Sequence, residues 1–105
     1  PLALVRAAVE SGVAGIDREP DRKRARSRMI MSEPTLRARL TERHGEQVDR
    51  LADALAERID DRLTARVVAS AGIAAYDLAW RLWSEGESET FRSVLDAVFE
   101  RMHAL

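Results

Sequence analysis

The sequence predicts an all-α protein, an antiparallel bundle of about five helices that forms a single domain over residues 1–105. Three observations support this fold class. Only three Pro and five Gly interrupt the chain, so helix is the dominant local preference. Apolar residues recur every three or four positions in each long segment. Alternation of apolar and polar residues nowhere persists over the length of a strand.

The first two predicted helices are short. One covers about residues 2–15 and weakens towards its glycines. A polar break, "DREPDR", separates it from a second helix over about residues 21–32. That helix carries Ala25 and Met29 on one side, with Ile30 further round, so we expect this side to face the core.

The third helix has the clearest start, because proline is favoured at the first helical position and Pro34 follows two capping candidates, Ser32 and Glu33. It is expected to run for about 26 residues to Ile59, with charged residues opposite one apolar stripe. Gly45 is a candidate bend. The stripe consists of Leu36, Leu40, Val48, Leu51, Leu55 and Ile59.

The last two helices follow closely. The fourth is expected from about Asp61, which is available as its cap, to Glu85, where Gly86 stops it. The fifth is expected to begin at Ser88 as N-cap and to end near Ala104. Its apolar stripe is continuous and consists of Phe91, Val94, Leu95, Val98, Phe99 and Met102.

The fourth helix has too little polar surface for an ordinary surface helix, because about two-thirds of its circumference is apolar. It carries two neighbouring apolar ridges, one of them nearly flat. Either the helix lies at the centre of a monomer, or a second copy covers it, and the second reading is preferred. The last two helices would then form a four-helix interface about a two-fold axis. One ridge is Leu63, Val67, Ala71, Ala74, Leu78 and Leu82; the predicted interface is Val68, Gly72, Ala75, Ala79, Trp83, Phe91, Val94 and Val98.

Bulk properties exclude several classes of protein. The net charge of −1 gives no reason to expect nucleic acid or a membrane as partner of this chain. The longest uncharged run is about half the length of a membrane-spanning helix. The absence of cysteine fits a cytoplasmic protein, and all but one of the 17 basic residues are Arg, which suggests a GC-rich bacterial genome.

One charged stretch has two readings. "DREPDRKRARSR", residues 17–28, carries a local charge of +3. Such clusters contact nucleic-acid phosphates in other proteins. Here acidic residues interrupt the run and no aromatic residue is interleaved, so a solvated helix face is the preferred interpretation.

The sequence predicts no enzyme, cofactor or metal site, because no catalytic motif, phosphate loop or metal-ligand spacing is present. A ligand pocket is a more plausible use of the larger apolar residues, since such pockets are mostly apolar with a few placed polar groups. For each candidate taken alone, ordinary core packing is the preferred interpretation, and a pocket is considered only for the set. The candidates are Met29, Leu36, Leu40, His44, Tyr76 and Trp80.

Three segments together resemble the C-terminal domain of TetR-family transcriptional repressors, with the mycofactocin-type regulators as the most similar subgroup. The basic helix motif matches at residues 26–30, "P-x-L-x-A" at 34–38, the end of the long helix at 55–59, and the Ala-rich helix closing with Trp and Gly at 71–86. The segments are "RSRMIMSEPTLRARLTERHGEQVDRLADALAERID", "ARVVASAGIAAYDLAWRLWSEGE" and "SETFRSVLDAVFERM".

The resemblance implies a homodimeric domain that senses a small apolar or amphipathic effector, acyl-like in this subgroup, and alters DNA binding. Operator DNA would be bound by an N-terminal helix-turn-helix domain, which is expected to lie outside this chain. Such control requires two helix arrangements that bind the effector differently. The alternative is a helical interaction module that binds a partner protein without a small ligand.

Overall fold

The computed structural model describes residues 3, 6–7, 17–86 and 89–105, and the regular structure within them is entirely α-helical. The predicted all-α class is thereby confirmed. The predicted first helix, residues 2–15, lies largely outside the described residues. The described helices are α3 (Pro20–Ser32), α4 (Pro34–Ala56), α5 (Arg62–Glu85) and α6 (Phe91–Ala104).

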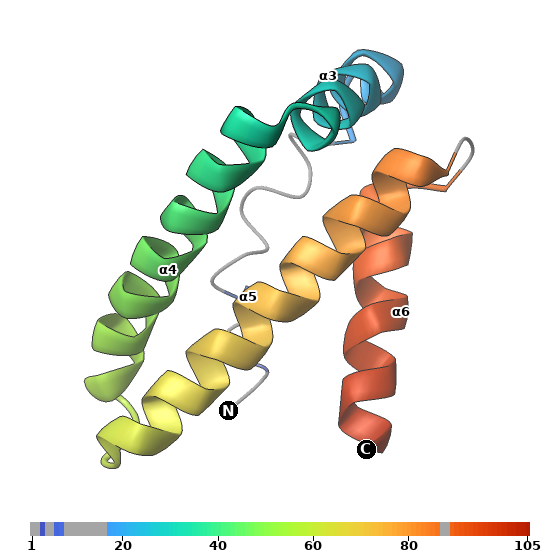
Figure 1. Cartoon of the computed structure of the whole chain (residues 1–105). Coiled ribbons are helices and arrows are strands. Elements are labelled where there is room, and N and C mark those ends of the chain that lie inside the picture. The colour runs from blue at the N-terminus through green and yellow to red at the C-terminus, as the bar shows by residue number, and fades with distance from the viewer. Residues whose placement is uncertain (1–2, 4–5, 8–16, 87–88) are drawn as a thin grey trace.

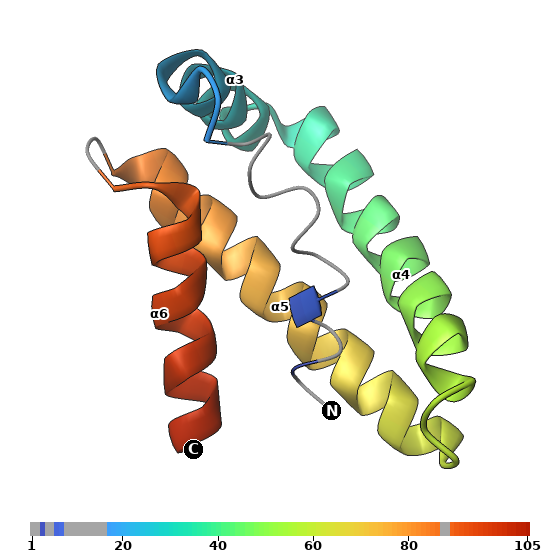
Figure 2. The same cartoon turned by 180° about the vertical axis from the view of Figure 1, so that it is seen from behind.

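Helix α5 lies between α4 and α6, both of which run antiparallel to it, and α3 packs on α4 and α5 near the C-terminal end of α5 (Figures 1 and 2). The radius of gyration is 14.2 Å, larger than the roughly 13 Å expected of a compact domain of this length. The chain is elongated, measuring 41 × 29 × 24 Å. A helix flanked on two sides in this way keeps a further side open.

The N-terminal caps explain where α5 and α6 begin. Asp61 caps α5 as predicted: its carboxylate accepts hydrogen bonds from Thr64 Oγ1 at 2.6 Å and Leu63 N at 3.1 Å. These bonds, that from the Thr64 hydroxyl first, lower the pKa of Asp61. Helix α6 is capped by Thr90, whose Oγ1 accepts from Ser93 N at 3.1 Å. The expected cap, Ser88, lies outside the described residues, and the helix starts later than predicted.

Helix α4 ends at Ala56, three residues before the predicted end at Ile59. The N–H groups of Arg58 and Ile59 both bond to the Leu55 carbonyl oxygen, at 2.9 and 2.8 Å. The bond from Arg58 spans three residues instead of four, so the last turn tightens as is common at helix ends, and the chain then turns into α5. Ile59 still packs against the core from this turn.

Gly45 lies in the interior of the continuous helix α4, where a bend was expected. A Cβ atom at this position would have no neighbouring heavy atom within 4 Å. Gly45→Ala should therefore stabilise the chain by about 0.5–1 kcal/mol, since alanine loses less backbone entropy in a helix. The free energy of unfolding in urea measures this, and a destabilised variant would show that the glycine is required.

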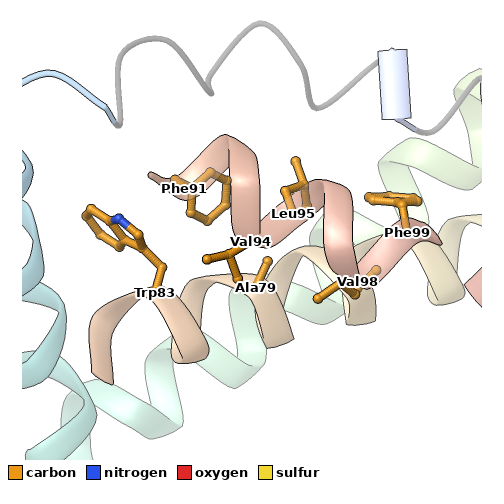
Figure 3. Packing of buried hydrophobic residues seen from close by; sticks show 8 residues of the cluster. Ala79, Trp83, Phe91, Val94, Leu95, Val98 and Phe99 are labelled. Atoms are coloured by element: carbon orange, nitrogen blue, oxygen red, sulfur yellow. The ribbon is translucent and has the colours of Figure 1, made fainter. Parts of the chain in front are cut away.

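Two clusters form the core of the described helices. The α4–α5 cluster consists of Ala52, Leu55, Ala65, Val68 and Ala69. In the α5–α6 cluster, small α5 residues such as Ala75 and Ala79 let α6 approach, and the large α6 side chains fill the space (Figure 3). Its members are Ala75, Ala79, Trp83, Phe91, Val94, Leu95, Val98 and Phe99.

Candidate functional site

The predicted dimer seam is buried within the single chain. The flat ridge of α5 is covered by the chain's own helices, α6 above all, so the small residues expected to receive a second copy instead receive neighbouring helices. Most of these side chains therefore have little surface left for a partner, although Val94 and Val98 also line a groove at the surface. The eight buried residues are Val68, Gly72, Ala75, Ala79, Trp83, Phe91, Val94 and Val98.

The other apolar ridge of α5 remains open. Leu63 and Val67 are 70% and 59% exposed, and Leu78 and Leu82 are each 46% exposed. Spacings of four and eleven residues, close to one and three full turns, place these side chains on one side of the helix. The sequence-based inference that α5 is apolar on more sides than its neighbours cover therefore holds, although the open side is not the predicted seam.

Next to this ridge, α5 and α6 enclose an open, largely apolar groove of about 560 Å³. Leu78 and Leu82 line it from α5, and Val94, Val98 and Met102 line it from α6. Arg101 lies at its rim, donating a hydrogen bond to the Ala97 carbonyl at 3.1 Å. Contiguous exposed apolar surface of this kind marks an interaction site in soluble proteins.

The predicted pocket residues separate into different places. Tyr76 and Trp80 pack on the α5–α6 cluster; the Tyr76 ring meets that of Phe91 edge-on at 5.3 Å, and Trp80 stacks on Trp83 at 5.2 Å. Met29 is 58% exposed and Leu36 is half-buried.

The other two members of the predicted pocket, Leu40 and His44, line a small polar hollow of about 50 Å³ between α4 and α5. There His44 Nε2 lies 3.7 Å from Asp77 Oδ1, and Arg81 Nε lies 3.4 Å from Asp77 Oδ2. The structure therefore brings together Tyr76 with Trp80 and Leu40 with His44, and it places Met29 and Leu36 in neither location.

The phenol of Tyr76 is a titratable probe of burial in the α5–α6 cluster. Burial raises the pKa of its phenol above the ordinary value of about 10. Because the folded chain favours the neutral phenol, the corresponding stability is complete below pH about 10 and is lost as pH rises through the folded-state pKa. Ultraviolet titration should give a higher midpoint in the native chain than in urea; equal midpoints would contradict the burial.

The side of α3 expected to face the core is exposed. Ala25 and Met29 lie at the surface, whereas Arg24 and Ser27 are buried, with 5% and 3% of their surface exposed. Arg24 and Arg28 reach backbone carbonyls at the end of α5. The solvated-face reading of residues 17–28 is therefore wrong for part of that stretch. The only sequence signal for this buried polar side of α3 was the helical spacing of Arg24, Ser27 and Arg28.

A buried donor lies in the same region. The indole Nε1 of Trp83 is buried and has no hydrogen-bond partner in the described part of the chain. Around it, the Trp83 ring contacts Trp80 and Phe91. Unsatisfied buried polar groups are rare enough in folded proteins to require an explanation.

Two further findings concern residues 3, 6–7, 17–86 and 89–105 only. Within them, no group of three or more His, Asp or Glu side chains is arranged to hold a metal ion. None of their helices combines the length and apolarity needed to cross a membrane.

Comparison with known proteins gives one match. A TetR-type family model, described as the MftR C-terminal domain, matches residues 1–105. No curated protein and no solved structure matches the chain.

Proposed function

We propose, since this chain belongs to the MftR C-terminal domain family of TetR-type regulators, that it is the ligand-sensing and homodimerisation domain of a transcriptional repressor. The full-length protein would bind operator DNA through an N-terminal helix-turn-helix domain. Effector binding in this domain would change the spacing of the two DNA-binding heads, which must dock on half-sites about one helical turn apart.

The observation that carries the dimer proposal is the open apolar groove between α5 and α6 together with the exposed ridge of α5. A two-fold axis places the same patch of both copies against each other. The ridge residue Leu78 of one copy would then enter the groove of the other. The last two helices of each chain would still form the four-helix contact, through the ridge of α5 that neighbours the predicted seam and with Val94 and Val98 of the predicted interface lining the groove.

Effector sensing is supported by the aromatic cluster on α5 and α6. Tyr76, Trp80 and Phe91 pack in the same cluster as Trp83, whose buried Nε1 has no hydrogen-bond partner among the described residues. An effector that opened this cluster would meet apolar side chains and one hydrogen-bond donor, the combination typical of small-molecule pockets. We therefore propose a small apolar or amphipathic effector that carries a hydrogen-bond acceptor.

Sedimentation equilibrium of the wild-type chain tests the first half of the proposal, and we expect a species of twice the 11.8 kDa chain mass. A monomer at all accessible concentrations would refute it.

Effector binding is tested by tryptophan fluorescence during titration with decanoate, with glycerol as a polar control. We expect a saturable change with decanoate only. A dimer that responds to neither compound would favour the interaction module instead.

A further inference from the structure

The inner face of α3 holds the C-terminal end of α5 through a buried arginine. Arg24 Nε donates to the Trp83 carbonyl oxygen at 2.9 Å, and a terminal nitrogen of its guanidinium donates to the Glu89 carbonyl. The guanidinium carbon lies 4.8 Å from the centre of the Trp83 ring. One side chain thus contacts the last turn of α5, the loop after it and the aromatic cluster.

Two neighbours on α3 extend this contact. Arg28 Nε donates to the Ser84 carbonyl at 2.5 Å, and its Nη2 donates to the Gly86 carbonyl at 3.1 Å. The hydroxyl oxygens of Ser27 and Ser84 lie 2.5 Å apart. The final carbonyls of a helix have no partners within it, so α3 satisfies groups that would otherwise need water.

The segment before α3 contacts the opposite kind of helix end. Asp17 accepts hydrogen bonds from the backbone N–H groups of Phe91 at 2.7 Å and Arg92 at 3.3 Å, at the start of α6. A helix C-terminus carries partial negative charge and an N-terminus partial positive charge. The positively charged arginines therefore contact the partly negative end of α5, and the negatively charged Asp17 contacts the partly positive start of α6, so both contacts are electrostatically favourable.

We propose that these contacts, made by Asp17, Arg24, Ser27 and Arg28, form a latch that transmits the position of the α5–α6 pair to α3. Arg24 is its positioning residue. This inference rests on the proposed function, because it makes the α5–α6 pair of the proposed dimer contact set the position of α3. The planar fork of arginine holds its acceptors in fixed directions, so a small shift of the last turn of α5 breaks several bonds together.

The first test compares two substitutions of the same type on α3. Arg24→Lys keeps the charge but loses the planar fork, and Arg26→Lys is the control, because Arg26 is exposed. Amide hydrogen exchange of α3 in Arg24→Lys should be faster by about tenfold, with exchange in the α4–α5 cluster nearly unchanged. The control should match the wild type. The latch would be overturned if Arg24→Lys exchanged uniformly faster in all helices, or if its exchange in α3 were no faster than in the wild type.

The second test asks whether the latch transmits the dimer contact. Leu78→Glu, which should separate the copies, is combined with Arg24→Lys, and exchange in α3 is measured for both single variants and the double variant. A latch makes the two effects non-additive, because Leu78→Glu can loosen α3 only through an intact Arg24 contact. If the wild type sediments as a dimer and the two effects on exchange in α3 are additive, transmission through the latch is refuted but the proposed dimer is not. A monomeric wild type would overturn the proposed function as well.

Discussion

Leu78→Glu should convert the proposed homodimer into a monomer and weaken association by at least about a hundredfold. Leu78 lines the α5–α6 groove and is 46% exposed in the single chain, so the substitution leaves most core contacts intact. In a two-fold dimer it places two carboxylates in a largely apolar contact, where each of them loses hydration. Sedimentation equilibrium over a series of concentrations measures the change.

Met29→Glu is the matched control, because Met29 is also a large exposed apolar residue but lies on α3, outside the groove. We expect it to remain dimeric. Circular dichroism should show the same helix content for both variants. A Leu78→Glu protein that stays dimeric, with its fold intact, would remove the groove from consideration as the interface.

Trp83→Ala should destabilise the chain by about 3–5 kcal/mol, the range observed when a buried aromatic side chain is truncated. Trp83 is 1% exposed, and its ring contacts Trp80, Phe91 and the guanidinium of Arg24. A domain of this size has only about 5–15 kcal/mol of stability in total. Most of the folded population should therefore be lost at modest urea concentrations, and unfolding followed by circular dichroism measures this.

Trp80→Ala serves as the control for the loss of a tryptophan from α5, since Trp80 is only partly buried. Its free energy of unfolding should fall by clearly less than that of Trp83→Ala. Equal losses would mean that the stacked pair, with its ring centres 5.2 Å apart, stabilises the chain as one unit. A small loss in Trp83→Ala would contradict the central place of this ring in the core.

Local signals predicted the helices well. Pro34 marked the start of α4, and Asp61 capped α5 as expected, because both act through atoms within one turn of the helix. The end of α4 and the start of α6 were less accurate. Both depend on which of several neighbouring residues completes the bonds at a helix terminus, and Leu55 and Thr90 were not distinguished by pattern.

The candidate site was predicted less well than the fold. Trp83 was assigned to a dimer seam but lies in the chain's own core. Arg24 was assigned to a solvated face but is buried, because its acceptor carbonyl lies 59 residues away in the sequence. The sequence shows that Arg24 is charged and therefore costly to bury. It does not show the distant carbonyl group whose hydrogen bond offsets this cost.

By itself, the sequence determined that the chain is helical and that α5 is apolar on two ridges. Tertiary structure alone decided that α6 covers the ridge of Ala75 and Ala79, and that Leu78 and Leu82 stay open. The reason is physical: periodicity measures how apolar each side of a helix is, whereas the neighbour that buries it is chosen by shape. The flat ridge admits the large side chains of α6 within one chain, which leaves the bulkier ridge exposed.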